Sequence, residues 1–325
     1  MADLVETMAY VGEKWGGKVP WHGKGTPVTN DLTPEQMLVK AGLDWEVIKK
    51  RCFVEWEGQY IPTDDWQLVR STDQKMLSIV SENWHVNQNR TAFEFFNEFV
   101  MRGNMEMHTA GSLDDGRMVW ALAKIDKEFF VANNIDRVVS YLLFSNPHKY
   151  GKCIDIRFTP ICVVCNNTLT FALNGKEDLQ VKLNHTKQFD AELVKKTLHI
   201  ADEKLENYQS MAQFLAGKRY TKESMVEYFK QVFPKVQNMN RKTKPKEGVD
   251  NDLSRPAKTA IEIIDATPHA PVSGDSWWTA FNTVTFAVDH LFGKDDTRLE
   301  SAWYGQGRAR KLNALNKAIE FAKAA

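Results

Sequence analysis

The chain has 325 residues, and its 42 Lys and Arg residues are balanced by 42 Asp and Glu residues, so its formal net charge is zero. This length predicts one large domain or two modest ones with enough material for a buried core. The balanced charge excludes a uniformly basic nucleic-acid-binding coat. No apolar run approaches the ~20 residues that span a bilayer, and the first residues lack the pattern of a signal peptide. Four cysteines indicate a reducing compartment rather than a disulfide scaffold. We therefore expect a cytoplasmic protein that makes no membrane contact.

Glycine, tryptophan and proline are dense in the first thirty residues, especially between Trp15 and Val28. This composition predicts a loop held by buried tryptophans, forming an N-terminal arm, and not a long helix or a regular strand. A helix follows, because Thr33 precedes a proline at the first helical position and Gly42 supplies a stop.

Two antiparallel sheets are predicted next. Three β-rich runs at residues 51–56, 66–71 and 76–81 are joined by turns at Glu57-Gly58 and Thr72-Asp73, as in a meander. A phenylalanine-rich helix is expected at residues 91–101. The second sheet has four predicted strands with a hairpin turn at Asp114-Asp115-Gly116, and we expect it to end in a short helix near Thr168. Its strands are at residues 105–112, 117–125, 137–145 and 152–163.

The character of the chain changes to helical after Asn184. The polar, lysine-rich stretch 234–255 predicts an exposed linker. The predicted fold class is α+β, with an antiparallel β-meander body, packed helices and a mostly helical C-terminal part. We divide the chain into an α+β body with the N-terminal arm (residues 1–184) and a helical region (residues 185–325). Helices are predicted at residues 190–217, 221–233, 257–265, 275–293 and 307–324.

No motif indicates catalysis. Cys162-Val163-Val164-Cys165 has no second ligand pair at zinc-finger spacing, so these cysteines are interpreted as buried packing residues. Trp21-His22-Gly23-Lys24-Gly25 lacks the spacing of a phosphate-binding Walker loop. A carboxylate metal site is possible in principle from scattered aspartates, but turn positions explain the first two of them. The aspartates are Asp114, Asp115, Asp126 and Asp155. We expect a protein that is not an enzyme and that needs no cofactor.

Basic residues recur on the second sheet and its turns, near Trp120 and Tyr150. Cations that contact phosphates and rings that stack on bases are typical of surfaces that follow single strands. An ordinary solvated sheet face has the same composition. A second basic group follows Gly305-Gln306-Gly307 at the start of a predicted helix, where backbone N–H groups favour an anion, although a solvated basic turn explains it equally well. The candidate nucleic-acid-binding residues are Arg117, Lys124, Arg137, Lys149, Lys152, Arg157, Arg308, Arg310 and Lys311.

Several segments together resemble one family of phage and plasmid proteins, the domain of unknown function 932 type. The segments are Trp21–Gly25, the Gly116–Ala121 segment GRMVWA, the stretch RFTPICVVCNNTLTFAL, and SAWYGQGRARKLNALNKAIEFA near the C-terminus. The resemblance implies genes of phages or mobile elements, often among replication and recombination functions. At the level of fold, a β-meander followed by a helix is also similar to ring-forming single-strand annealing proteins.

Two hypotheses of different classes follow. The first is a phage-encoded DNA-metabolism protein that binds single-stranded DNA and promotes annealing as a homo-oligomer. The second is a protein–protein interaction module that binds or inhibits a host protein without contacting nucleic acid; zero net charge and the tryptophan-rich arm favour it. A metal-dependent nucleic-acid enzyme is a third, less favoured reading.

Overall fold

The fold is seen in a computed structural model that describes residues 5–12, 25–132, 136–162, 167–168, 180–192, 201–235 and 253–325. The chain forms two compact units. The first comprises residues 1–128, 139–160 and 178–204, and the second comprises residues 129–138, 161–177 and 205–325. Antiparallel sheets are combined with helices and with a helical C-terminal region, so the α+β prediction is confirmed.

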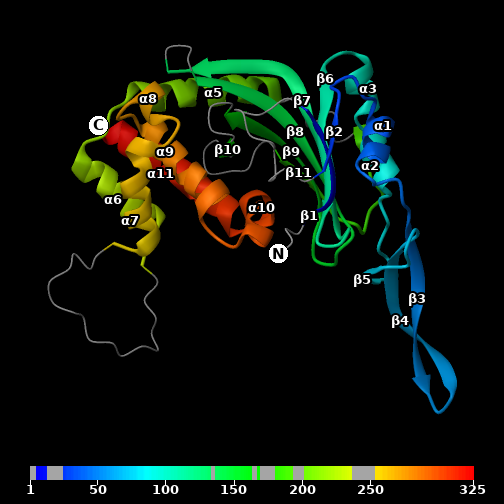
Figure 1. Cartoon of the computed structure of the whole chain (residues 1–325). Coiled ribbons are helices and arrows are strands. Elements are labelled where there is room, and N and C mark those ends of the chain that lie inside the picture. The colour runs from blue at the N-terminus through cyan, green and yellow to red at the C-terminus, as the bar shows by residue number, and fades with distance from the viewer. Residues whose placement is uncertain are drawn as a thin grey trace, which may run out of the picture. The chain divides into compact units, whose positions relative to one another are not determined.

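A large sheet has the strand order β10-β9-β8-β7-β6-β1-β2 (Figure 1). Strand β11 also pairs with β9, at Ile154–Arg157, whereas β10 pairs with its far end at Ile161–Cys162. Strands β6 and β7 form the predicted hairpin around Asp114-Asp115-Gly116, and both aspartates have positive φ. Most residues of its central strands β6, β7 and β8 are buried. The strands are β1 (Val5–Val11), β2 (Thr26–Val28), β6 (Met105–Leu113), β7 (Met118–Val131), β8 (Asp136–Pro147), β9 (Ile154–Cys162), β10 (Asn167–Thr168) and β11 (Gln180–Leu183).

A small sheet of three antiparallel strands confirms the first predicted meander. It consists of β3 (Val47–Trp56), β4 (Gln59–Arg70) and β5 (Met76–Ser81). Strand β5 pairs with β4 only along Asp65–Val69, so the far ends of β3 and β4 form a two-stranded ribbon (Figure 1). We call residues 53–62 the distal hairpin. Its turn at Glu57-Gly58 has positive φ at both residues, which matches the right-handed twist of a hairpin.

Three short helices belong to the first unit: α1 (Pro34–Lys40), α2 (Asn89–Glu94) and α3 (Asn97–Met101). Helix α1 has the predicted start, because the Thr33 hydroxyl accepts from the Gln36 backbone N–H while the Gln36 side chain accepts from the Thr33 N–H. The single helix predicted at residues 91–101 is instead broken between α2 and α3, where Phe95 and Phe96 are both buried.

The second unit is mainly helical. Helix α11 packs against α6, α9 and α10. The core of this unit includes Trp277, Trp278 and Phe281 of α9, all of which are fully buried. The Tyr228 hydroxyl donates to the Ala314 carbonyl at 3.1 Å, which joins α6 to α11. The helices are α5 (Ala201–Gly217), α6 (Lys222–Val232), α7 (Arg255–Ile263), α8 (Ala270–Ser273), α9 (Trp277–Phe286), α10 (Asp295–Tyr304) and α11 (Gln306–Ala324). A 3₁₀ turn at Ile264–Ala266 follows α7, and a π-helical turn at Ala287–Leu291 follows α9.

Three further local expectations differ from the structure. Residues Val5–Val11 form strand β1, which lies between β6 and β2 in the large sheet, although the glycine-rich composition of the first thirty residues predicted no regular strand. Asn167–Thr168 pair with β9 as a strand and do not start a helix. Helix α10 was missed, because its first turn is rich in aspartate and its apolar positions are few.

Several predicted features lie outside the described residues. These are the tryptophan-bearing part of the arm at residues 13–24, Val163 to Asn166 of the cysteine motif, the segment 193–200 of the predicted helix 190–217, and residues 236–252 of the predicted linker.

The contact between β1 and β6 leads to a stability prediction. A Cβ at Gly111 would lie 2.4 Å from the Thr7 carbonyl oxygen and 3.1 Å from the Trp120 ring, so Gly111→Ala must push two strands apart. We expect a loss of about 1–3 kcal/mol in the free energy of unfolding, measured by urea denaturation. Gly217→Ala is the control, because a Cβ there meets nothing within 4 Å. Equal stability of the two variants would contradict this packing.

Candidate functional site

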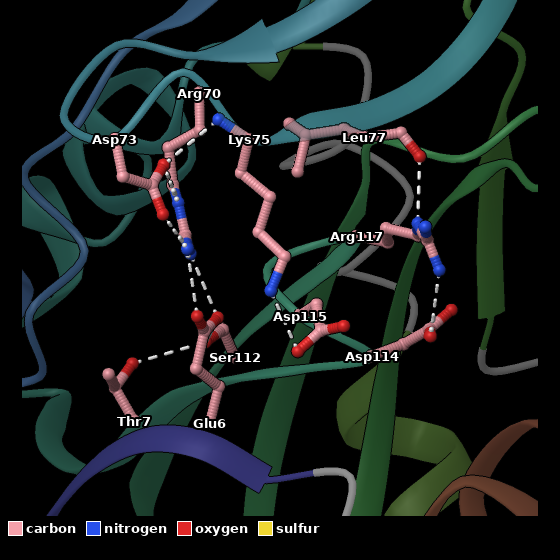
Figure 2. Close-up of polar contacts among 10 residues, drawn as sticks. All are labelled: Glu6, Thr7, Arg70, Asp73, Lys75, Leu77, Ser112, Asp114, Asp115 and Arg117. Carbon is pink, nitrogen blue, oxygen red and sulfur yellow. Dashed lines mark hydrogen bonds and ion pairs between the residues drawn. The ribbon is translucent and has the colours of Figure 1, made fainter.

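Arg70 connects the small sheet to the large sheet within the first unit (Figure 2). Its guanidinium lies at the end of β4, and it donates two hydrogen bonds of 2.9 Å to the Glu6 carboxylate of β1. Two further bonds, of 2.9 and 2.6 Å, go to the Asp73 carboxylate. Glu6 also accepts from the Ser112 hydroxyl of β6 at 3.2 Å. A buried arginine is stable only when it is paired in this way.

The charges at this junction stabilise one another. The hydrogen bonds that Arg70 donates to Asp73 and then to Glu6 raise the pKa of Arg70 above its usual value. The hydrogen bond from Arg70 holds the pKa of Asp73 below its usual range. The guanidinium also lies 5.5 Å from the centre of the Trp45 ring, a cation–π contact. The Arg70–Asp73 pair therefore stays ionised near neutral pH.

A second set of ion pairs joins β5 to the β6–β7 turn (Figure 2). Lys75 lies 2.9 Å from Asp115, and the Arg117 side chain donates to the Leu77 carbonyl at 2.8 Å. Asp114 bridges two cations, since one of its oxygens lies 3.2 Å from Arg117 and the other 2.7 Å from Lys149. The Lys75–Asp115 and Arg117–Leu77 contacts, together with the Arg70 cluster, fix the base of the small sheet, while Asp114 holds the Arg117 side chain in place.

His148 is a buried structural group on the turn after β8. Its Nε2 lies 2.8 Å from Asn89 Oδ1, and the Asn89 amide donates to the Leu43 carbonyl at 3.0 Å. The Nε2–H of the ring therefore donates to Asn89. Burial lowers the pKa of His148 to about 3, so this histidine adds no positive charge at neutral pH.

The distal hairpin exposes apolar side chains on both of its faces. Val54 is paired with Ile61 on one face, which also carries Trp56, while Phe53 is paired with Pro62 on the other, which also carries Tyr60. The exposed fractions are 56% for Phe53, 64% for Trp56 and 74% for Tyr60. An exposed apolar surface of this kind commonly marks an interaction site.

An irregularity in β4 separates the distal hairpin from the rest of the small sheet. The register shifts between Arg51 and Phe53, so that Cys52 of β3 faces three residues of β4. At this position the Thr63 hydroxyl takes the place of a backbone donor, since it donates to the Cys52 carbonyl at 3.2 Å. Such bulges bend and twist a strand, and Pro62 is accommodated just beyond this one.

The predicted nucleic-acid-binding residues of the first unit have different surroundings. Arg117 and Lys149 are brought together by Asp114, and the Lys152 N–H donates to the Lys149 carbonyl at 3.3 Å in the same turn. Lys124 is half-buried on β7. Arg157 is 5% exposed and lies 2.7 Å from Asp155. The acidic partners therefore neutralise much of the expected positive surface.

The predicted residues of the second unit serve mostly in packing. Lys311 is 1% exposed and lies 2.8 Å from Asp289 in the π-helical turn. Arg310 lies 5.3 Å from the Phe233 ring centre. The Gly307 N–H already donates to the Ser301 hydroxyl at 3.1 Å, so it is not available to donate to an anion. Arg308 and Arg137 are half-buried.

The aspartates considered for a metal site are mostly used in ion pairs. Asp114 and Asp115 face cations of the first unit, and Asp155 faces Arg157. In the part of the chain that the structure describes, no three His, Cys, Asp or Glu side chains are grouped to hold a metal ion. None of the described helices is long and apolar enough to cross a membrane.

The sequence predicted the Glu57-Gly58 turn of the distal hairpin but not the strand that follows it directly. The sequence contains the pattern of a hairpin, because the Glu57-Gly58 turn lies between two short runs that carry aromatic residues. The predicted second strand of this meander began at residue 66 and omitted residues 59–65, because Pro62, Asp64 and Asp65 are unfavourable in strands.

The fold and the site define a two-unit α+β protein with an ion-paired junction between two sheets and a projecting apolar hairpin. A family model described as "Domain of unknown function (DUF932)" matches residues 76–318, so the chain belongs to this family. Comparison with curated proteins and with solved structures gives no significant match.

The neutral state of His148 predicts a pH dependence of stability. Because its folded pKa lies near 3 and its ordinary value is 6.5, the unfolded chain binds this proton first as the pH falls. His148→Gln should lower the free energy of unfolding at neutral pH by about 1–3 kcal/mol, through loss of the buried contact with Asn89. The difference from wild type should shrink as the pH falls below about 6.5 and reverse in sign before pH 3, because a pKa lowered from 6.5 to about 3 corresponds to about 5 kcal/mol.

His85→Gln is the control for this titration, because the His85 side chain is exposed. Chemical denaturation at a series of pH values measures all three proteins. A difference between His148→Gln and wild type that stays constant with pH would contradict a buried neutral imidazole.

Proposed function

We propose that this protein is a non-catalytic interaction module whose distal hairpin binds another polypeptide. The observation that carries the proposal is the exposure of Phe53, Trp56 and Tyr60 on both faces of a two-stranded ribbon. Aromatic side chains dominate the energetics of protein interfaces. A ribbon of only two strands has no core of its own and is marginally stable in water, so a bound partner would bury its apolar surface.

The base of the hairpin supports this function. Arg70 is held by Glu6 and Asp73, while Lys75 and Arg117 hold β5 on the β6–β7 turn. The base of the small sheet that carries the recognition surface is thus held in place, which lowers the conformational entropy lost on binding. Interaction surfaces built on rigid elements are also more selective than those on loops.

The double variant Trp56→Ser, Tyr60→Ser tests this function. In a pull-down from lysate of the source cell, wild type should retain one stoichiometric protein after nuclease treatment, and the double variant should bind it at least about tenfold more weakly. Tyr150→Ser is the matched control, because Tyr150 is 68% exposed and lies outside the hairpin. Equal capture by wild type and the double variant would contradict the proposal.

A second candidate is binding and annealing of single-stranded DNA, in the setting of phage or mobile-element DNA metabolism. The supporting observation is that β3 places the exposed side chains of Lys50 and Arg51 next to the rings of the distal hairpin. Cations beside stacking rings suit a sugar–phosphate strand with unpaired bases. The turn that carries Lys149 and Lys152 would add phosphate contacts, although Asp114 already pairs with Lys149.

Fluorescence anisotropy of a labelled oligonucleotide tests this candidate. Binding at micromolar protein should weaken as salt rises, because each phosphate contact releases counterions. Lys50→Gln with Arg51→Gln should reduce both the affinity and the salt dependence, whereas Lys323→Gln at the exposed C-terminal end should not. Absence of salt-sensitive binding would rule out this function and leave the interaction module.

A further inference from the structure

The backbone groups on the outer edge of β3 are hydrogen-bonded at one end of the strand, whereas no strand of the described residues pairs with the other end, which we call the open edge. Strand β3 is an edge of the small sheet. At its inner end, the Gln88 side chain accepts from the Val47 N–H at 2.9 Å and donates to the Val47 carbonyl at 3.0 Å, as a neighbouring strand would do. From Lys50 to Trp56, no strand of the described residues pairs with this edge.

The direction of the backbone groups along β3 follows from two contacts. The Cys52 carbonyl faces β4, because it accepts from the Thr63 hydroxyl. The Val47 groups face the outer edge, where Gln88 binds them. Backbone groups alternate along a strand, so those of Arg51, Phe53 and Glu55 point to the open edge. Any strand that pairs there must match its own outward-facing residues to these three.

The sequence of this edge is complementary to itself in an antiparallel arrangement. If Phe53 lies opposite Phe53 of a second copy, then Arg51 lies opposite Glu55 and Glu55 lies opposite Arg51. The same register places Lys50 opposite Trp56, a cation beside an aromatic ring. All of these side chains are largely exposed. The Arg51 guanidinium donates through Nε to the Thr63 carbonyl at 2.9 Å and lies 3.9 Å from the exposed Asp64 carboxylate, so Glu55 of a second copy would compete with Asp64 for it.

The neighbouring symmetric registers are less favourable. Centring the pair on Cys52 places Arg51 opposite Phe53. Centring it on Val54 places Phe53 opposite Glu55 and moves the partner of Arg51 to Glu57, whose positive φ puts it in the turn. The Cys52-centred register would also place Lys49 opposite Glu55, but the Lys49 ammonium already donates to the Trp84 carbonyl at 3.1 Å. The Phe53-centred register is the one of these three that places Arg51 opposite Glu55 in both directions.

We propose that two copies of this chain associate through the open edge of β3, with Phe53 on the two-fold axis. The two ribbons then form one four-stranded antiparallel sheet, in which Arg51 of each copy faces Glu55 of the other. On one face, the Phe53 rings of both copies lie side by side and are flanked by Tyr60. This inference rests on the proposed interaction role of the ribbon. The second copy occupies the edge of β3, and the faces of the ribbon stay exposed to bind the other polypeptide.

Seven residues from each strand make a small interface, so we expect a reversible dimer with a Kd in the micromolar range. The dimer doubles the number of exposed rings on each face of the ribbon. The surface proposed to bind another polypeptide therefore becomes larger when the chain dimerises.

Charge reversal tests the register. The variants Arg51→Glu and Glu55→Arg each place two like-charge pairs across the interface, and self-association should weaken by about tenfold or more. Mixing the two variants at equal concentration restores both opposite-charge pairs in a heterodimer, and the double variant Arg51→Glu, Glu55→Arg restores them in a homodimer. Sedimentation velocity of the full chain over a concentration series measures each species.

Asp65→Arg is the matched control, since it makes the same charge change as Glu55→Arg on β4 and leaves the β3 edge unchanged. The expected result is dimerisation of wild type, of Asp65→Arg, of the double variant and of the mixture, but not of either single variant. A wild type that stays monomeric, or single variants that dimerise like wild type, would overturn the proposal. Because Trp56→Ser, Tyr60→Ser tests capture of another polypeptide separately, failure here leaves that function standing.

Discussion

The arrangement of the first unit depends on one buried arginine. Arg70 ends the strand that carries the distal hairpin, and its guanidinium is shared between Glu6 of the large sheet and Asp73 of the β4–β5 turn. Five donors in a planar fork suit two carboxylates at once, which a lysine ammonium does not. Gly116 allows this geometry, since a Cβ there would lie 2.9 Å from the Arg70 guanidinium. Without the Glu6 and Asp73 carboxylates, the Arg70 guanidinium would be an unpaired, desolvated charge at the junction of the two sheets.

The distal hairpin has the opposite physical character. At its base, β4 is covered by two neighbours and the Leu68 side chain is fully buried. Beyond the bulge at Thr63, the ribbon has two strands and no buried layer. The hydrophobic effect therefore contributes little to the folding of residues 53–62 and remains available for binding. The ion pairs at the base hold the ribbon in place, while its own faces stay exposed.

Much of the architecture could be predicted from the sequence, because its signals are local. The Thr33 capping box, the Asp-Asp-Gly hairpin turn and the three-stranded meander each depend on a few adjacent residues. Strand β1 could not be predicted in this way, because its pairing with β6 joins residues that are a hundred positions apart. The candidate site was harder still. Arg117 and Lys149 could be identified from the sequence as surface cations. Their shared ion pair with Asp114 could not, because it depends on tertiary neighbours. The burial of Arg157 and Lys311 depends on tertiary neighbours in the same way.

The charges on β3 show why a count of basic residues is a poor guide to the partner. Cations on an edge strand oppose indiscriminate pairing with other strands, because desolvation of an unmatched charge is unfavourable. A carboxylate placed four residues further on changes this effect, since an antiparallel copy then meets each cation with an acid. Arg51 and Glu55 therefore disfavour most registers and favour one. The same two side chains can act as protection against aggregation and as the determinant of a specific partner.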